Sequence, residues 1–185
     1  MDRPREQIEK YLEQMCRTLR RLPQGEIARL AEILAQAREE GRRVFLFGNG
    51  GSAATASHFA CDLGKGTVRE GRPRFKVIAL NDNMPIFSAY ANDFGYETVF
   101  AEPLVSLSEP GDVAIGISTS GNSANVLRAI EVAQERGLVT VGLTGFQGGQ
   151  LKDKVDLCII VPSDSMQQVE DAHLVILHAV FLALC

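Results

Sequence analysis

Residues 44–56 read VFLFGNGGSAATA, and residues 113–124 read VAIGISTSGNSA. In each stretch, apolar residues lead into a loop of glycine, serine and asparagine, and the loop leads into a helix-forming sequence. An unbroken apolar run is typical of a buried parallel strand, and a loop between strand and helix turns free backbone N–H groups toward one point. The positive end of the helix dipole lies at the same point. Two such loops predict a binding site for a phosphorylated small molecule.

Short runs rich in valine and isoleucine alternate with helical patterns from residue 43 onward, which predicts about five strands. The expected strands are Val44–Phe47, Phe75–Leu80, Val113–Ile117, Val139–Leu143 and Leu157–Val161. Their lack of polar alternation is typical of parallel strands covered on both faces. We therefore predict a three-layer α/β/α sandwich around a mostly parallel sheet, with residues 1–185 forming a single domain.

The first 41 residues predict two helices ahead of this core. Ile8, Leu12 and Met15 recur at helical spacing before Pro23, and a second amphipathic pattern ends at Gly41. We expect an N-terminal helical hairpin over residues 1–41 and an α/β core over residues 42–185. The hairpin either packs on its own domain or builds an oligomer interface, and its apolar stripes are compatible with both.

Composition narrows the class of protein. The chain has 185 residues, of which 45% are hydrophobic and 23% charged, with a net charge of −4. This composition supports a sizeable hydrophobic core. No basic block indicates a nucleic-acid partner, and no apolar stretch is long enough to span a membrane. The charged N-terminus is not followed by an apolar signal core, so we expect a soluble, cytoplasmic protein.

Two nucleotide-binding interpretations of the first loop fit poorly. Gly48, Gly50 and Ala53 satisfy the relaxed dinucleotide fingerprint, which also requires an acidic residue about 20 positions later for the ribose. The corresponding region, residues 71–74, reads GRPR, and Asp82 comes too late. The GxxxxGK[ST] pattern of nucleoside-triphosphate binding is absent from the sequence.

Candidate metal ligands follow the first loop. His58 and Asp62 are four residues apart, so on the predicted helix they share one face and can reach one divalent metal. The C-terminal helix carries His173 and also His178, which lies inside an apolar run. A lone histidine in such a run is more often a hydrogen-bonded core residue than a ligand, so both interpretations of His178 remain open.

Taken together, these motifs resemble the phosphoheptose isomerase family of SIS (sugar isomerase) domain proteins. The resemblance runs from about Ile8 to the C-terminus and rests on GNGGS (48–52), HFA (58–60), NDFG (92–95), GISTSGNSANV (116–126) and LTG (143–145). It implies conversion of sedoheptulose 7-phosphate to D-glycero-D-manno-heptose 7-phosphate through an enediol(ate). It also implies a zinc-dependent homotetramer with sites between subunits.

The resemblance further implies the residues of the site. The phosphate would be bound by Ser118, Thr119, Ser120 and Ser123. The sugar would be contacted by Asn49, Gly50, Gly51, Ser52, Asn92 and Asp93, and also by Asp62 and Glu170. Zinc (Zn2+) would be held by His58, Asp62, Glu170 and His178. Within this set, Asp62 would be the catalytic base and His178 the catalytic acid.

Three positions depart from the family pattern. Asp62 replaces a glutamate and shortens its reach, Glu170 replaces a glutamine and adds an anion, and Lys65 stands where the family has an arginine. On a continuous helix, Glu170 and His178 would be separated by about 12 Å of rise. Both could reach one metal only if Glu170 precedes the regular helix or if the two residues serve through different chains.

These departures leave two alternatives open. The chain could be an isomerase of another phosphosugar, or a non-catalytic sugar-phosphate-binding module that regulates a protein partner. Retention of a helical carboxylate and a final histidine favours an enzyme over the binding module.

Overall fold

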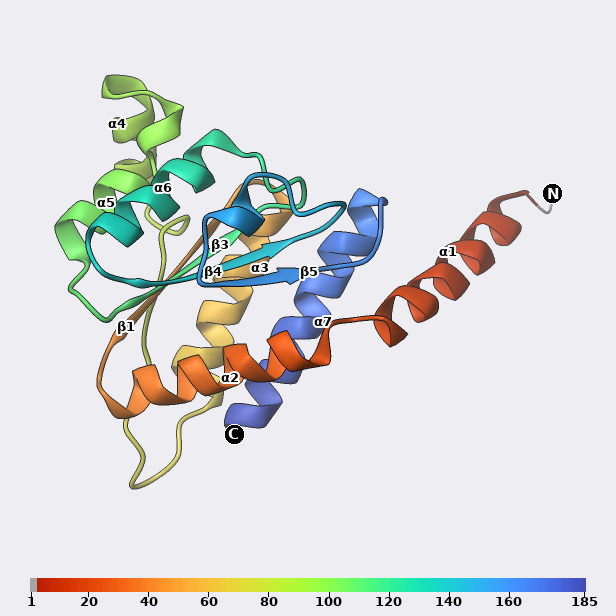
Figure 1. The fold of residues 1–185 in the computed structure, drawn as a ribbon, viewed down its shortest axis with the longest axis horizontal. Coiled ribbons are helices and arrows are strands. Elements are labelled where there is room, and N and C mark those ends of the chain that lie inside the picture. The colour runs from red at the N-terminus through yellow and green to blue at the C-terminus, as the bar shows by residue number, and fades with distance from the viewer. Residues whose placement is uncertain (1–2) are drawn as a thin grey trace.

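The computed structural model describes residues 3–185 as a parallel sheet between two layers of helices (Figure 1). The strand order is β2-β1-β3-β4-β5, and each neighbouring pair is parallel. The strands are β1 (Arg43–Gly48), β2 (Lys76–Ala79), β3 (Val113–Ile117), β4 (Val139–Thr144) and β5 (Leu157–Ile160). The predicted α/β sandwich is confirmed, and so are all five predicted strands.

Helices cover both faces of the sheet. One face is covered by α2 (Gln24–Glu39), α3 (Gly51–Cys61) and α7 (Met166–Leu184), and the other by α4 (Met84–Asp93), α5 (Ala101–Leu107) and α6 (Ala124–Glu135). Shorter helical turns are η1 (Asp62–Gly66, a π-helix), η2 (Tyr96–Thr98) and η3 (Leu151–Asp153). Across residues 3–185, we find no helix with the length and apolar character needed to cross a membrane.

The continuous apolar sequence of β1 is explained by this layering. Successive residues of a strand point to opposite faces. Val44 and Leu46 join the core beneath α2, α3 and α7, whereas Phe45 and Phe47 join the core beneath α5 and α6. All four side chains are fully buried. A strand that is buried on both faces has no position for a polar residue, which is why its pattern does not alternate.

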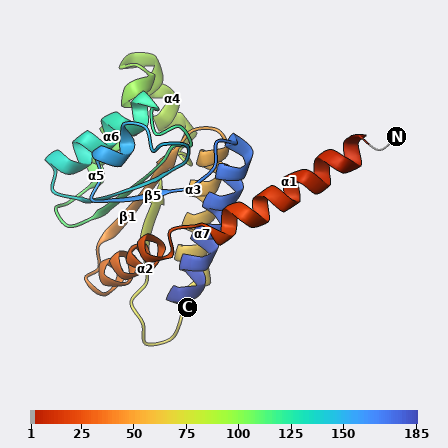
Figure 2. The same ribbon diagram turned by 45° about the vertical axis from the view of Figure 1, so that its right-hand side comes forward.

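The two N-terminal helices do not form the predicted hairpin. After the turn at residues 21–23, α2 packs on the domain, but α1 (Arg3–Arg20) projects away from it (Figures 1 and 2). Met15 and Thr18 near the end of α1 are buried, while Ile8 and Leu12 are 60% and 57% exposed. The interpretation that the hairpin packs on its own domain is therefore wrong for the outer turns of α1, because these turns extend past the body of the chain.

The inner half of α1 is attached to the start of α7. The Tyr11 hydroxyl donates to the Asp171 carboxylate, and the Thr18 hydroxyl donates to the side-chain oxygen of Gln168 over 3.0 Å. The Gln168 oxygen also accepts from the hydroxyl of Ser163. These bonds fix the direction in which α1 leaves the domain.

Candidate active site

The loops that follow β1 and β3 separate at the carboxyl edge of the sheet. These strands are neighbours, with Gly48 paired to Ile117 at their ends. The chain after β1 enters α3 on one face, whereas the chain after β3 enters α6 on the other face (Figure 1). Ligands of open α/β sheets bind where neighbouring strands send their connections to opposite faces. The two loops singled out by the sequence therefore border one crevice.

Glycine residues let the first loop run close to its neighbours. A Cβ atom at Gly48 would lie 2.7 Å from the carbonyl oxygen of Ile117, and Gly50 has a φ of +55°. The helix α3 begins at Gly51, inside the predicted loop GNGGS (48–52). The first turn of α3 is consequently part of the loop, and its Ser52 and Ala53 N–H groups donate to the carbonyl oxygens of Asn49 and Gly50 over 3.0 and 3.1 Å.

Glu170 lies against this end of α3. A Cβ atom at Gly51 would lie 2.7–2.8 Å from the carbon and both oxygens of the Glu170 carboxyl group. The partial positive charge at the start of α3 stabilises a carboxylate in this position. Glu170 therefore borders the part of the crevice that was predicted to contact the sugar.

The second loop gathers hydroxyl groups at the start of α6. The Oγ atoms of Ser118 and Ser123 are 3.0 Å apart, and the Ser120 hydroxyl accepts from the Asn122 N–H. Gly121 has a φ of +66°, and a Cβ there would lie 2.1 Å from the carbonyl oxygen of Gly148, so the turn requires glycine. Ser123 gives α6 no side-chain cap, and the Val126 and Leu127 N–H groups donate to Asn125 Oδ1 and to the carbonyl oxygen of Ser123. Among the described residues, the N–H groups of Ala124 and Asn125 are left for a ligand.

A pair of side-chain amides joins the two loops. Asn49 Nδ2 donates to Asn125 Oδ1, and Asn125 Nδ2 donates to Asn49 Oδ1, each over 2.9 Å. The Tyr96 hydroxyl, from η2, also donates to Asn49 Oδ1 over 2.9 Å. Asn125 is 2% exposed. Asn125 and Tyr96 were not predicted to be site residues, because their partners are distant along the chain.

Cavity volume alone does not identify the site. A cavity of about 140 Å³ lies beside the first loop and is lined by Asn49, Asn81 and Tyr96, among others. A larger cavity of about 340 Å³ lies at the opposite edge of the sheet, around the first residues of β3, β4 and β5. We place the site at the loops because polar side chains and the N-termini of α3 and α6 converge there.

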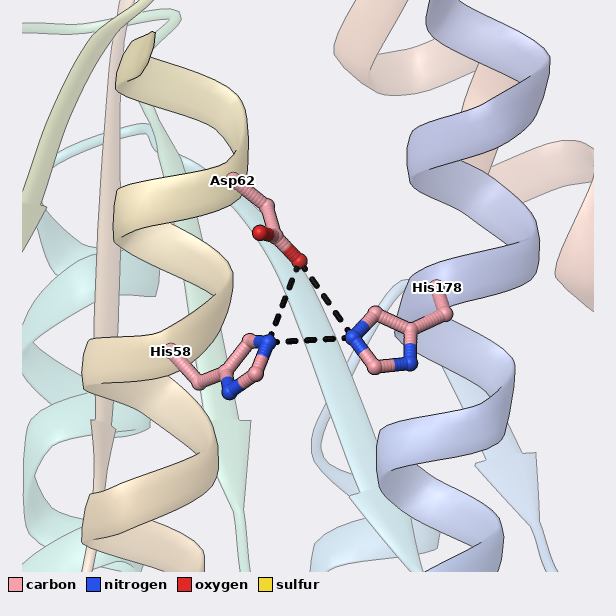
Figure 3. A group of neighbouring side chains, drawn as sticks. All are labelled: His58, Asp62 and His178. Carbon is pink, nitrogen blue, oxygen red and sulfur yellow. Dashed lines mark hydrogen bonds and ion pairs between the residues drawn. The ribbon is translucent and has the colours of Figure 1, made fainter. Parts of the chain in front are cut away.

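Three potential metal ligands meet between α3 and α7 (Figure 3). The Nε2 atoms of His58 and His178 are 3.0 Å apart. Each lies 3.5 Å from Oδ2 of Asp62. This arrangement confirms that His58 and Asp62 share one helix face, and it decides between the two interpretations of His178, which is not a core residue.

The geometry of these three residues fits a zinc ion. Ligand atoms about 2.0–2.1 Å from a tetrahedral zinc stand about 3.3 Å apart, close to the separations observed here. Oδ2 of Asp62 is buried and has no hydrogen-bond partner within residues 3–185. A buried carboxylate oxygen is costly unless it is paired, and a cation in the cluster would pair it. Two imidazoles and a carboxylate are also the ligand types that zinc prefers.

The π-helix η1 positions Asp62 and brings α7 close. Asp62 is its first residue, immediately after the last residue of α3. A Cβ atom at Gly66 would lie 2.6 Å from the ring of Phe181, one turn beyond His178 on α7. Single π-helical turns are frequent at functional sites. Here the wide turn and its glycine allow α7 to approach α3 closely enough for His178 to reach His58.

Other predicted site residues lie outside this cluster. The helix α7 is continuous from Met166, so about 12 Å of helix rise separates Glu170 from His178. Within one chain, Glu170 is therefore not brought to the other three predicted zinc ligands. Asn92 and Asp93 lie exposed at the end of α4 and bond to each other over 2.7 Å. They were predicted to contact the sugar, and they are not among the residues that line the cavity beside the first loop.

His173 has a structural position. It is 1% exposed, and its Nε2 atom lies 3.2 Å from the carbonyl oxygen of Thr144. Burial lowers the pKa of His173 to about 4, although the bond to Thr144 acts in the opposite direction. The imidazole is thus neutral near pH 7 and donates through Nε2 to the end of β4.

The fold, the glycine-rich first loop and the hydroxyl-rich second loop define a class of sugar-phosphate-binding protein. The family model of the SIS domain matches residues 8–145. Phosphoheptose isomerase of Thermodesulfovibrio yellowstonii is 44% identical over 82% of this chain and 75% of its own length. That of Geobacter sulfurreducens is 41% identical over 90% of this chain and 88% of its own.

Solved structures agree with these relatives. The structure of phosphoheptose isomerase GmhA from Neisseria gonorrhoeae has a TM-score of 0.90 and 29% identity, covering 97% of both chains. A phosphoheptose isomerase from Francisella tularensis also has a TM-score of 0.90, at 30% identity, and covers 97% of this chain and 96% of that one. The chain belongs to the phosphoheptose isomerase family of SIS domain proteins, as the sequence motifs predict.

Proposed function

We propose that this chain is a phosphosugar isomerase that converts sedoheptulose 7-phosphate to D-glycero-D-manno-heptose 7-phosphate. Family membership supports the substrate. The observation that carries the reaction type is the meeting of Asp62, His58 and His178, two of which lie on the helical segment that continues from the first loop. We also propose that residues 1–185 act as one SIS domain.

In this proposal the second loop binds the phosphate. Its ligands are the hydroxyl and N–H groups of Ser118, Thr119, Ser120 and Ser123, at the positive end of α6. The carbon chain of the sugar then lies along Gly50, Gly51 and Ser52 of the first loop. Asn49 has one free N–H for a hydroxyl group, and Glu170 accepts from another. The bound phosphate group lies away from the reacting carbons C1 and C2, so the role of phosphate binding is to orient these carbons.

The isomerisation moves two protons. The Asp62 carboxylate removes a proton from C1 of the ketose. The proton on Asp62 exchanges with solvent, and Asp62 then returns a proton to C2 of the enediolate. The hydroxyl group on C1 loses its hydrogen, and O2 gains one. We propose that His178 moves this second proton between the two oxygens. No electron donor or acceptor is needed, because C1 is oxidised as C2 is reduced within one molecule.

Zinc is the cofactor that fits His58, Asp62 and His178, and when bound it supplies a Lewis acid that stabilises negative charge on the sugar oxygens. The Nε2 atom of His178 faces the other two ligands. A nitrogen cannot hold a proton and a metal at the same time. The acid and ligand roles of His178 therefore exclude each other at Nε2, and zinc content and turnover have to be measured separately.

We further propose a homotetramer with sites at its subunit interfaces. Support comes from the exposed Ile8 and Leu12 on α1, and from α4, on which no residue is fully buried. Asn92 and Asp93 on α4 would then contact the sugar in a neighbouring copy. Light scattering on a size-exclusion column tests this assembly: a tetramer is expected, and Ile8→Glu with Leu12→Glu should dissociate it. A monomeric wild-type chain would contradict it.

The test of the function is incubation with sedoheptulose 7-phosphate in D₂O, followed by NMR of the sugar phosphates. We expect a new aldose phosphate with deuterium at C2, which appears with zinc and disappears with a chelator. Exchange with a different phosphosugar only would favour another substrate. Binding of sugar phosphates with neither product nor deuterium uptake would favour the non-catalytic module.

A further inference from the structure

The two loops of the crevice belong to different packing units. The first loop continues into α3, which carries His58 and leads directly to Asp62. The second loop continues into α6 on the other face of the sheet. The β1–β3 ladder aligns the strands only up to Gly48 and Ile117. Beyond these residues, the distance between the two loops depends on side chains.

Asn49 and Asn125 supply that link. Their two mutual hydrogen bonds, each 2.9 Å long, are the only side-chain bonds between the two loops and their helix starts within residues 3–185. Two antiparallel bonds between planar amides fix both the separation and the relative orientation of the groups that carry them. The pair therefore joins the first loop to the start of α6.

The bonding capacity of these amides is nearly filled. Oδ1 of Asn49 accepts from Asn125 and from Tyr96, and Oδ1 of Asn125 accepts from Asn49 and from the N–H of Val126 over 3.0 Å. A carboxamide oxygen has two lone pairs, so both oxygens are saturated. Asn125 is also 2% exposed. It is in no position to contact a substrate directly, and any effect it has on the reaction must act through Asn49.

We propose that Asn125 is a positioning residue for the isomerisation. It holds Asn49, and with it the loop leading to His58 and Asp62, at the distance from the phosphate loop that the bound sugar phosphate requires. Tyr96 supports Asn49 from the η2 side. This inference rests on the proposed function, because it assumes that the phosphate and the reacting carbons occupy the two loops.

The consequence is a coupling between phosphate binding and chemistry. A phosphate held by the second loop orients the reacting carbons only if the first loop has a fixed relation to it. Displacement of a reacting group by about 1 Å can cost about 100-fold in rate. Loss of the amide pair should therefore lower turnover while inorganic phosphate, which contacts the second loop alone, binds as before.

The experiment is a double-mutant cycle with Asn49→Ala, Asn125→Ala and the double variant, in zinc-containing buffer. We measure kcat and KM for sedoheptulose 7-phosphate per folded protein, and the inhibition constant of inorganic phosphate. Gln134→Ala is the matched control, because Gln134 is on α6 and its side-chain amide donates to Lys154, at the end of the helix away from the crevice. It should retain wild-type kcat.

Each single variant should lose about 10- to 100-fold in kcat, with the phosphate inhibition constant changed by less than about threefold. The double variant should resemble the singles, since residues that act as a unit are not additive. Wild-type kcat in Asn125→Ala, or losses that multiply in the double variant, would overturn the proposal. So would an equal loss of inorganic phosphate affinity, because it would indicate general damage to the second loop.

The proposed function can fail separately. The wild-type chain could bind sedoheptulose 7-phosphate without turning it over. In that case calorimetry on the same variants measures the dissociation constant of the sugar phosphate. We then expect weaker binding of the sugar phosphate in both single variants and unchanged binding of inorganic phosphate. Unchanged binding of the sugar phosphate would refute the positioning role independently of catalysis.

Discussion

Gly66 and Phe181 are in direct contact where the π-helix η1 meets α7. A Cβ atom at Gly66 would lie 2.6 Å and 2.8 Å from two carbons of the Phe181 ring. His178 lies one turn before Phe181 on the same helix, and Asp62 begins the π-helix that Gly66 ends. The close approach of these two elements is therefore a condition for the cluster of His58, Asp62 and His178.

Gly66→Ala should disturb both stability and metal binding. The added methyl group overlaps the Phe181 ring, and overpacking of this kind costs about 1–3 kcal/mol. Movement of α7 would also withdraw His178 from His58, so zinc should bind more weakly. Denaturant unfolding and zinc titration measure the two effects.

Gly25→Ala is the control for this substitution. Gly25 lies in the first turn of α2, and a Cβ atom there would meet no other atom of residues 3–185 within 4 Å. Alanine there should leave zinc binding unchanged and stabilise the fold by at most about 1 kcal/mol. Equal behaviour of the two variants would show that the contact between Gly66 and Phe181 does not hold α7 in place.

Substitution of any residue in the cluster of His58, Asp62 and His178 should weaken zinc binding. His58→Ala, Asp62→Asn and His178→Ala should each weaken zinc affinity by more than the roughly 10- to 100-fold typical of outer-shell changes. His173→Gln is the control, because His173 is buried against Thr144 rather than in the cluster. Zinc content after dialysis, measured by atomic emission, gives the result. Full zinc occupancy in all three cluster variants would exclude this site.

Glu170→Gln should keep zinc and change substrate binding. Within one chain Glu170 lies over Gly51, not at the three ligands. Removing its negative charge from the crevice should lower KM for an anionic sugar phosphate, because like charges repel. Zinc affinity and KM are measured on the same preparation. A large loss of zinc would instead indicate that Glu170 reaches the metal of a neighbouring copy.

Acid should destabilise the fold through His173. Its pKa is lowered by burial to about 4, below the ordinary value of 6.5. Below pH 6.5 the unfolded chain binds a proton that the folded chain excludes, so stability falls from pH 6.5 to about pH 4 and then levels off. The shift corresponds to roughly 3 kcal/mol in total.

His173→Gln removes this titration, so its unfolding free energy should fall less between pH 6.5 and pH 4 than that of the wild-type chain. Urea unfolding at several pH values measures the difference. Parallel curves for the two proteins would mean that His173 is not the responsible group. The two proteins are compared by the slope of their unfolding free energy against pH, because the substitution also changes stability at neutral pH.

Much of the fold could be predicted from local sequence. Strands such as Val113–Ile117 are unbroken apolar runs, and a strand buried on both faces must have that pattern. The two loops could also be placed, because parallel strands end at the same edge of a sheet. The helices α4 and α5 were not predicted. They are short, and α4 has no fully buried residue, so it lacks a strong apolar stripe.

The α/β sandwich, the two phosphate-type loops and the pairing of His58 with Asp62 could be predicted from local sequence, because each depends on spacing within one strand or one helix. The packing of the folded chain was needed to show that His178 joins them, that Glu170 lies at the start of α3, and that Asn125 meets Asn49. Residues 49 and 125 are distant along the chain, and their contact depends on strand order and on close packing at particular glycines. Local periodicity carries no information about either.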